Sequence, residues 1–344
     1  LAKDIPTNLG LTEEEVIFAL LSPQTPPEQI KAALRECGRR LWFVNLRDGR
    51  WVFGSPNLNK LVSDYVDRVQ KDPAMRGAWW DRIKEELEEW RVDAIKGYKA
   101  AVSSRKEWKT RLFQDRDIIV WPSGPDDVPD DKSPKLILLD YRIPEDGSPG
   151  AEFTPRVAST VDEAVKAANE FFERYSTARE RKYKNTVFFL VADREMIEKE
   201  GGPKSRATTL LALDQMKRDK ENLERVIGPA GIRNIDSMLR TEKAQLRQSC
   251  YVVYKYLVYP SRSGLSAVEL GQERFDSRLF FYNVEKELRE DLRKVVDSVT
   301  PEALVERYWP ARDRVEVEEL IEGFYTVSYT HLRAHETEAD LVCR

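Results

Sequence analysis

Cysteine and histidine, two of the most reactive side chains, are scarce in this 344-residue sequence. The three cysteines, Cys37, Cys250 and Cys343, are far apart and odd in number, so they predict neither a disulfide framework nor a zinc knuckle and favour a reducing cytoplasm. The two histidines, His331 and His335, have the spacing of two ligands on one helix face, but no glutamate lies between them. We therefore predict no metal site. Both histidines lie in residues 327–344, which are excluded from the expected fold below, so we also predict no Ser-His or Cys-His catalytic pair.

Long apolar runs are also absent. No window approaches the roughly 18 uncharged apolar residues of a membrane-spanning helix, so no membrane partner is expected. The 56 basic and 60 acidic side chains give a net charge of −4, so DNA binding would need a local basic patch. Aromatic residues make up 10% of the sequence, which argues against wholesale disorder, and the length fits two or three globular domains.

Neither end of the sequence has the features of a natural terminus. It opens at Leu1 without a methionine or a signal-like segment, which predicts the interior of a longer reading frame. Residues 327–344 resemble a translated sequencing-adaptor peptide of the kind that contaminates metagenomic assemblies. We exclude this predicted artefactual tail, and with it both histidines, from the expected fold.

The first 70 residues combine two helix signals with a hairpin signal. Capping boxes at 12–15 and 25–28 each start a helix. Two β-rich runs, 41–45 and 50–53, are joined by a loop that contains Asp-Gly, a strong hairpin signal. This order is that of the second half of a winged-helix domain. We predict a winged-helix-like module over residues 1–70, whose first helix could lie upstream.

Basic side chains gather on the second helix and the hairpin. Six of them against three acidic residues give this region a local charge of +3. In a DNA-binding protein they would contact phosphates, with the second helix in the major groove. The alternative is a module that packs between domains of a larger machine, and the small size of the patch favours packing. The candidate nucleic-acid-binding residues are Lys31, Arg35, Arg39, Arg40, Arg47 and Arg50.

The pattern changes twice after the module. Residues 71–115 predict a helical connector, because apolar and aromatic residues recur at three- and four-residue steps. Residues 116–326 predict an α/β domain with a mostly parallel sheet and C-terminal helices, since strand, capped helix and apolar strand form a βαβ unit. The expected elements are helices at 73–113, 160–175, 204–227, 231–257 and 283–298, and strands at 117–121, 136–141 and 186–192. The overall class is therefore mixed α and β.

No phosphate-binding loop is found. A P-loop requires G-x-x-x-x-G-K-[ST], and this sequence has no Gly-Lys-Ser/Thr. The segment most similar to this motif, residues 200–205, has a proline where a glycine N–H is needed. We therefore favour an ordinary helix start here over an anion-binding one. Asp140 and Asp193 each follow an apolar strand, as a Walker B aspartate does, but turn capping explains both more simply. A hydrolase that uses these two carboxylates is a third alternative. We predict no catalytic residue and name no cofactor-binding residue.

Three segments together resemble one protein family. They are Leu11 to Pro23, the hairpin from Arg40 to Phe53, and Lys184 to Asp193. The family is the large prokaryotic AAA+-like ATPases classed as domain of unknown function 499, which are found beside DNA methyltransferase genes in anti-phage loci. The similarity covers about residues 11–326, and it rests on hydrophobic patterns.

The P-loop of that family lies N-terminal to the region matched here. The resemblance therefore implies a non-catalytic C-terminal portion of an ATPase, which couples the motor to DNA or to partner proteins. It implies no cofactor in this chain, and ATP and magnesium in the parent protein. The implied partners are the upstream ATPase domain of the same chain, DNA, and a DNA methyltransferase or other defence-system subunits. The alternative is a stand-alone winged-helix DNA-binding regulator.

Overall fold

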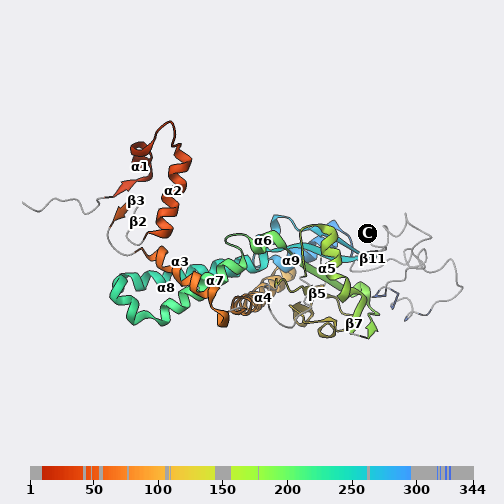
Figure 1. Ribbon diagram of the computed structural model, residues 1–344. Coiled ribbons are helices and arrows are strands. Elements are labelled where there is room, and N and C mark those ends of the chain that lie inside the picture. Colours follow the sequence, from red (N-terminus) through yellow and green to blue (C-terminus); the bar gives the residue numbers. More distant parts are fainter. Residues whose placement is uncertain are drawn as a thin grey trace, which may run out of the picture. The chain divides into compact units, whose positions relative to one another are not determined.

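The computed structural model describes residues 10–41, 44–47, 49–53, 57–75, 77–104, 108, 110–143, 156–176, 178–261, 264–295, 316, 318, 322, 323, 325 and 326. These residues form two compact units. Unit 1 consists of those within Leu1–Asp81 and Lys204–Leu246, and unit 2 of those within Arg82–Pro203 and Arg247–Arg344. The chain combines helices with a sheet that is parallel at its core, so the predicted α/β class is confirmed (Figure 1).

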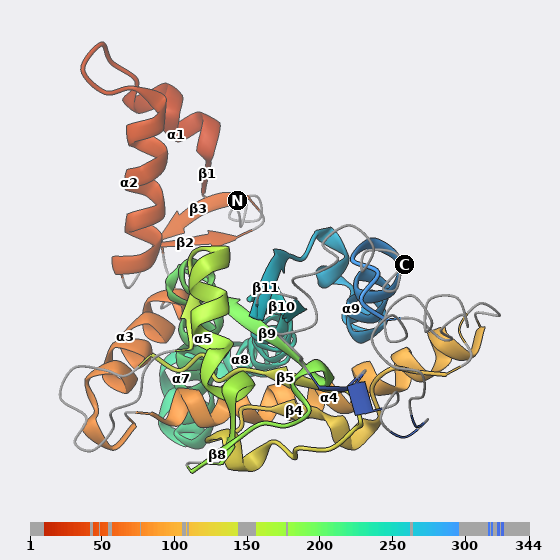
Figure 2. The ribbon, with the colours of Figure 1, turned by 90° about the vertical axis from the view of Figure 1, so that its right-hand side faces the viewer.

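Unit 1 begins with a small module of two helices and a three-stranded sheet. Its elements are β1 (Leu11–Thr12), α1 (Glu13–Leu20), α2 (Pro27–Arg40), β2 (Val44–Arg47) and β3 (Arg50–Phe53). The strands pair antiparallel in the order β1-β3-β2, and α1 and α2 lie next to this sheet (Figure 2). Gly49, with a φ of 75°, provides the left-handed turn residue of the predicted hairpin. Part of the predicted loop between the β-rich runs lies outside the described residues.

The rest of unit 1 is a helical bundle. It is built from α3 (Leu58–Lys71), α7 (Pro203–Arg218) and α8 (Lys220–Val252). Their shared core contains Leu61 and Tyr65 of α3, Leu213 of α7, and Leu223 and Ile235 of α8. Residues 204–246 therefore pack with the N-terminal part of the chain, whereas we expected them inside the α/β domain. Sequence periodicity identifies an apolar helix face but not the element that the face packs against.

Unit 2 is built on a six-stranded sheet. Its strands are β4 (Ile118–Val120), β5 (Lys135–Leu138), β6 (Val157–Ala158), β9 (Val187–Asp193), β10 (Tyr254–Ser261) and β11 (Gly264–Glu269). The order is β11-β10-β9-β5-β4, with β6 paired to the end of β9. The predicted strands, present as β4, β5 and β9, are parallel as expected. The short strand β6, which was not predicted, is also parallel, while β10 and β11 are antiparallel additions. The shorter elements are β7 (Arg174–Ser176), β8 (Arg179–Glu180) and α6 (Arg194–Glu198).

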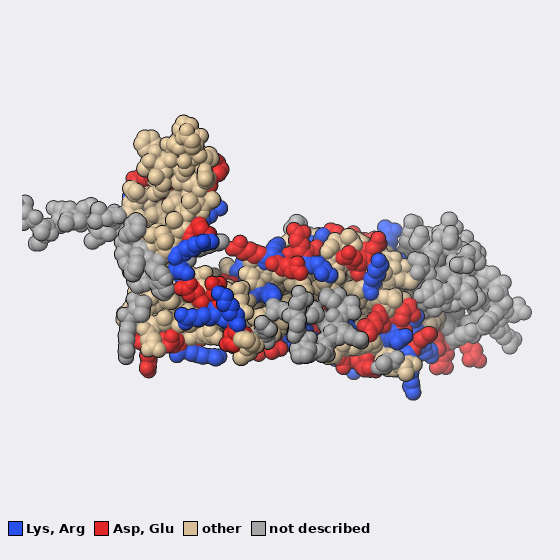
Figure 3. Space-filling view, viewed as in Figure 1, with Lys and Arg blue, Asp and Glu red and all other residues tan. Residues whose placement is uncertain are grey.

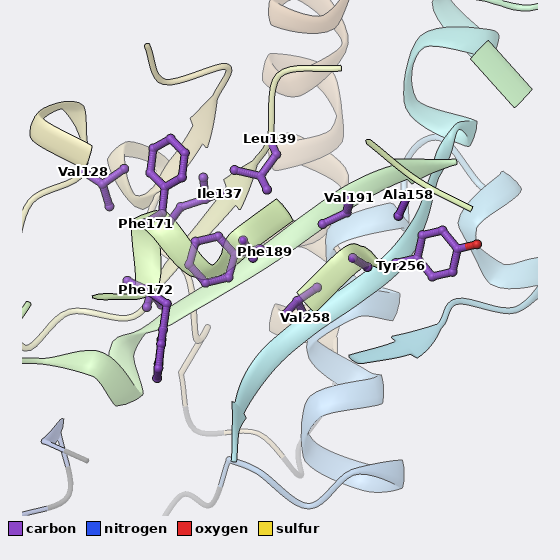
Figure 4. Packing of buried hydrophobic residues seen from close by; sticks show 13 residues of the cluster. Val128, Ile137, Leu139, Ala158, Phe171, Phe172, Phe189, Val191, Tyr256 and Val258 are labelled. Carbon is purple, nitrogen blue, oxygen red and sulfur yellow. The ribbon is translucent and has the colours of Figure 1, made fainter. Parts of the chain in front are cut away.

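Both faces of β9 are covered, because all seven of its residues are buried. On one face, α5 (Val161–Glu173) contributes Phe171 and Phe172 to a core that includes Phe189 of β9 and Val258 of β10 (Figure 4). The alternate residue Phe188 contacts the ring of Phe113. The buried position of β9 explains why its sequence is apolar without alternation.

The long helix α4 (Ala78–Ser104) is part of a core rather than only a connector. From Arg82 onward it belongs to unit 2, where Trp90 stacks on Tyr251 with ring centroids 4.7 Å apart. Trp90 also contacts Phe280 of α9 (Phe280–Lys286). The predicted boundary at 115/116 thus differs from the observed one, because the aromatic stripe of the helix is buried in unit 2.

Two predicted helices have different limits in the structure. The helix expected at 231–257 ends at Val252, and Tyr254–Ser261 forms β10. Three tyrosines and a valine give this segment a high strand propensity. In the structure it pairs with both β9 and β11. The helix expected at 204–227 is interrupted at Asp219, between α7 and α8. The helix expected at 283–298 is present as Phe280–Lys286, followed by a π-helical turn over Glu287–Asp291, and residues 296–298 lie outside the described part of the chain.

Candidate protein- or nucleic-acid-binding surface

We name residues 10–53 the N-terminal module, and its start is fixed by a capping box. The Glu15 amide donates to Thr12 Oγ1 at 3.1 Å, and the Thr12 amide donates to Glu15 Oε2 at 2.7 Å. These reciprocal bonds confirm the box predicted at 12–15 and satisfy two backbone donors of α1. At the other end, Asn57 Nδ2 donates to the Gly38 and Leu41 carbonyls, which joins the end of α2 to the start of α3.

Arg50, one of the six candidate DNA contacts, holds the module together. Its Nη1 donates to the Gly10 carbonyl at 2.8 Å and lies 3.4 Å from Glu15 Oε2. The guanidinium thus bridges the chain before β1 and the capping box of α1. A side chain in this position stabilises the module, and its removal would alter the fold as well as any DNA contact.

Two further candidates have acidic neighbours. Lys31 Nζ lies 3.9 Å from Glu13, and Arg40 forms an ion pair with Glu36, one turn earlier in α2. Arg35 of α2 is exposed. The other two candidates, Arg39 and Arg47, lie in α2 and β2, but their side chains are outside the described part of the molecule.

The N-terminal module as a whole is electrically balanced. It contains six basic and six acidic side chains, because α1 adds three glutamates to the acidic residues of α2 and the hairpin. The structure places Glu13 and Glu15 next to two of the candidate basic residues. The charge of +3 in the second helix and hairpin is therefore offset within the same module, which weakens the expected attraction for phosphates.

The most unusual property of the N-terminal module is its exposed apolar surface. The helix α1 has no buried residue, and Phe18 is 87% exposed. Among the described side chains of the module, the only buried apolar ones larger than glycine are Ile30 and Val44. Large apolar side chains with 45% or more of their surface exposed are Leu11, Phe18, Leu20, Leu21, Leu41 and Leu46. The face shown in Figure 3 is correspondingly poor in charge over α1 and α2.

Cross-strand pairing organises part of this surface. In the sheet, Trp51 of β3 is directly opposite Leu11 of β1 on one side and Leu46 of β2 on the other. Directly opposed residues project from the same face of a sheet, so these three side chains form a row. A Cβ atom at Gly38 of α2 would lie 3.2 Å from the Trp51 ring, and Trp51 Nε1 is buried without a hydrogen-bond partner.

Sequence reasoning did not identify this surface. The signal is present as six consecutive apolar residues, 16–21, in and just after a helix of only eight residues. A helix that is apolar all round is normally buried on all sides. The sequence therefore predicts that α1 needs cover on more than one face, but periodicity alone does not show which faces the rest of the chain leaves uncovered.

The two strand-end aspartates of unit 2 are occupied by local contacts. Asp140 accepts from the Arg142 backbone amide at 2.9 Å and from Arg142 Nε at 2.7 Å. Asp193 is the N-cap of α6 and accepts from the Met196 amide at 2.9 Å, while Lys255 Nζ lies 3.6 Å from its other oxygen. These contacts confirm the favoured capping interpretation of both carboxylates.

Aromatic residues fill the adjacent ends of the parallel strands. Trp121 follows β4 with a φ of 50°, and its Nε1 donates to Tyr254 Oη at 2.9 Å. Tyr141 packs edge-on against both rings. Burial raises the pKa of Tyr141 and of Tyr254 well above the ordinary tyrosine value, so both hydroxyls are neutral. This end of β4 and β5 is a packed aromatic core.

The segment 200–205 starts a helix, as favoured. Pro203 is the first residue of α7, and Gly201 has a φ of 78° in the turn before it. A Cβ at Gly202 would lie 2.6 Å from the Met196 carbonyl, so close backbone packing requires this glycine. Lys204 Nζ lies 5.3 Å from the centre of the Trp79 ring. This contact between the ammonium group and the indole ring gives Lys204 a structural role that does not require a bound phosphate.

Among the described residues, no group of three or more His, Cys, Asp or Glu side chains could hold a metal ion. Within those limits, no helix has the length and apolar character needed to cross a membrane. Comparison of the sequence and fold with models of protein families, with curated proteins and with solved structures found no match.

Proposed function

We propose that this chain is a non-catalytic C-terminal portion of a large P-loop ATPase of a phage-defence or DNA-modification system. We further propose that its N-terminal module couples the motor to a protein surface rather than to DNA. The ATPase class is supported by the family resemblance of three segments, two of which form α1 and the hairpin. Protein coupling is supported by one observation above all, the exposure of Phe18 on an apolar helix without a buried residue.

The charge distribution supports a protein partner over DNA. Specific DNA-binding surfaces are strongly positive, because affinity depends on phosphate neutralisation and counterion release. The N-terminal module is balanced at six basic and six acidic side chains, and Arg50 is engaged within the module. Apolar side chains without cover are typical of protein interaction sites.

The parent reading frame provides the direct test. We expect G-x-x-x-x-G-K-[ST] upstream of Leu1 in the source DNA, and no ATP turnover above blank by the purified chain. A start codon directly before Leu1 would overturn the proposal. ATP hydrolysis by this chain that is lost in Lys204→Ala would also overturn it, because the segment 200–205 would then act as a phosphate site.

A stand-alone DNA-binding regulator is the second candidate, favoured by the exposed Arg35 and Arg40 on α2. It predicts duplex binding that weakens between 50 and 200 mM salt (about tenfold or more). The double variant Arg35→Ala with Arg40→Ala should reduce the slope of log affinity against log salt by about 2. The matched control is Lys96→Ala with Arg116→Ala, which removes the same charge from exposed positions of unit 2. Equal loss in both double variants would count against a specific role for α2.

A further inference from the structure

A small basic and aromatic surface lies at the amino ends of β5 and β9 in unit 2. Lys132 precedes β5, and Lys182 and Tyr183 precede β9. These two strands are parallel neighbours, so both begin at the same edge of the sheet. Lys182 Nζ lies 4.9 Å from the centre of the Tyr183 ring. We name Lys132, Lys182 and Tyr183 the basic edge surface.

Two largely buried side chains fix the backbone of this surface. Asp130 accepts from the Lys182 amide at 2.8 Å and from the Tyr183 amide at 3.0 Å. Arg181 is 3% exposed, and its guanidinium donates to two carbonyls of the loop before β5 and lies 3.7 Å from Asp130. None of these contacts involves a bound segment, so the backbone of the surface is preformed.

The basic edge surface holds a carboxylate of the same chain. Lys182 Nζ donates to both oxygens of Glu322, each at 3.2 Å. Tyr183 Oη donates to Glu322 Oε1 at 3.3 Å, and Lys132 Nζ lies 3.6 Å from the same oxygen. All three side chains of the surface therefore converge on one glutamate.

The bound segment is a helical turn with an ionised glutamate. The Thr326 amide donates to the Glu322 carbonyl at 3.1 Å, which is the bond of a helical turn. Asn185 Nδ2 donates to the Thr326 carbonyl at 3.3 Å, a second contact at the same edge of the sheet. The hydrogen bond from the Lys182 ammonium lowers the pKa of the Glu322 carboxyl, which is therefore charged at neutral pH.

The two segments have opposite charge, but their contact is exposed. Residues 315–326 contain four glutamates and no basic residue, whereas residues 179–185 contain four basic residues and one acidic residue. Such complementarity selects an acidic segment and orients it. The side chains of Lys182 and Glu322 are 53% and 37% exposed, and solvent-exposed ion pairs are weak. The bound segment can therefore be replaced by another acidic segment that makes more contacts.

We propose that the basic edge surface is a docking site for an acidic helical segment of a partner protein, and that Glu322 covers this site in the free protein. The chain's own segment is thus autoinhibitory and displaceable. A tethered segment has an effective concentration in the millimolar range, so only a partner with further contacts displaces it. This inference is independent of the proposed ATPase, because all of its residues lie in unit 2.

The test titrates a fluorescent peptide with the sequence of residues 315–326 into the full chain, up to about 1 mM. Glu322→Gln should bind the peptide about threefold or more tightly than the unaltered chain, because the competing segment is weakened. Lys182→Ala added to Glu322→Gln should abolish this binding. The matched control is Glu318→Gln, which removes the same charge from an exposed position of the same segment and should leave the affinity unchanged.

Reversal of the charges tests the pairing itself. A chain with both Lys182→Glu and Glu322→Gln should prefer a peptide that carries Glu322→Lys over the unaltered peptide. Equal preference of this chain for the two peptides would show that Lys182 does not select the carboxylate, and would overturn the docking site.

The other contrary outcomes are distinct. Equal peptide affinity of the unaltered chain and Glu322→Gln would overturn the autoinhibitory role of Glu322. Binding that survives Lys182→Ala, or no binding to Glu322→Gln at about 1 mM peptide, would overturn the docking site. Sedimentation of the unaltered chain as a dimer that Glu322→Gln dissociates would overturn the proposal in favour of exchange of this segment between two copies.

Discussion

At the scale of single residues, the N-terminal module separates basic side chains that hold the fold from those that face solvent. Arg50 donates to the Gly10 carbonyl and lies close to Glu15, whereas Arg35 is exposed. The two arginines carry the same charge and are in the same module. Their comparison therefore distinguishes a structural role from a binding role, which the sequence alone does not do.

We expect Arg50→Ala to lower the local stability of β1 and α1 by about 1 kcal/mol, because a charge-assisted bond to a half-buried carbonyl is lost. Arg35→Ala should change it by less than about 0.5 kcal/mol. Native-state hydrogen exchange of the α1 amides measures both values. Equal effects of the two variants would show that the Arg50 contacts do not stabilise the module.

Buried ionisable side chains of unit 2 predict a loss of stability at alkaline pH. Burial raises the pKa of the Cys250 thiol and of the Tyr98, Tyr141 and Tyr254 hydroxyls. The folded protein therefore holds these protons more tightly than the unfolded chain, whose cysteine and tyrosine pKa values are about 8.5 and 10. The free energy of unfolding should be unaffected by these groups below about pH 8 and fall steadily above it.

Thermal midpoints between pH 7 and 10.5 test this expectation. Cys250→Ala should destabilise unit 2 at every pH, because a fully buried side chain is truncated. The variant should also make the thermal midpoint fall less steeply between about pH 8.5 and 9.5, where the thiol of the unfolded chain would otherwise ionise. Cys37→Ala, at a half-exposed position of α2, is the control. An unchanged decline in Cys250→Ala would contradict the assignment to this thiol.

At the scale of elements, the kink in α8 shows how one glycine directs two helical segments to the same core. Gly228 has a φ of 70° and precedes Pro229, which lacks an amide proton for the helix. Leu223 before the kink and Ile235 after it both lie in the core with α3 and α7. The helix break predicted between 227 and 231 is confirmed at this glycine.

Gly228→Ala should cost about 1 kcal/mol of unfolding free energy, since a side chain disfavours the left-handed backbone. Nothing lies within 4 Å of the added Cβ, so the cost would come from the backbone alone. Urea unfolding followed by circular dichroism measures it. Gly124→Ala is the matched control, because Gly124 has an extended φ of −160° and equally open space. A neutral Gly228→Ala would mean that the kink relaxes without loss.

Local signals in the sequence predicted the elements better than their partners. The capping box at Thr12, the hairpin and the parallel strands β5 and β9 are all encoded within short windows, and the structure has them. Asp219 was not recognised as a break, although its carboxylate accepts from Tyr65 of α3. That contact joins residues 154 positions apart. It cannot be predicted from a sequence window of 10 to 20 residues (roughly the length of a helix).

The same limit applied to the candidate surface. The sequence showed the basic residues of the second helix and the hairpin, but not that Glu13 and Glu15 of the preceding helix lie next to Lys31 and Arg50. It also showed that α1 is apolar, but not that the module leaves Phe18 uncovered. Charge balance and exposure depend on which elements pack together, so they become visible only in three dimensions.

At the scale of the whole molecule, the order of segments along the chain differs from their grouping in space. Unit 1 combines residues that precede the α/β region with residues 204–246, which interrupt unit 2. The bundle core around Leu213 and the sheet core around Phe189 have no residue in common. A domain with its own core can fold and unfold as a unit, so each unit should respond mainly to truncation of its own core.

Two truncations test this independence. Leu213→Ala should cost about 2–5 kcal/mol and Phe189→Ala about 3–5 kcal/mol, because both side chains are fully buried. In native-state hydrogen exchange, Leu213→Ala should reduce protection in α3 and α7 while sparing α5 and β9, and Phe189→Ala should do the reverse. Equal loss in both units from either variant would instead establish one cooperative unit. In that case α4 and α8, whose residues are divided between the two units, would be the elements that transmit the effect.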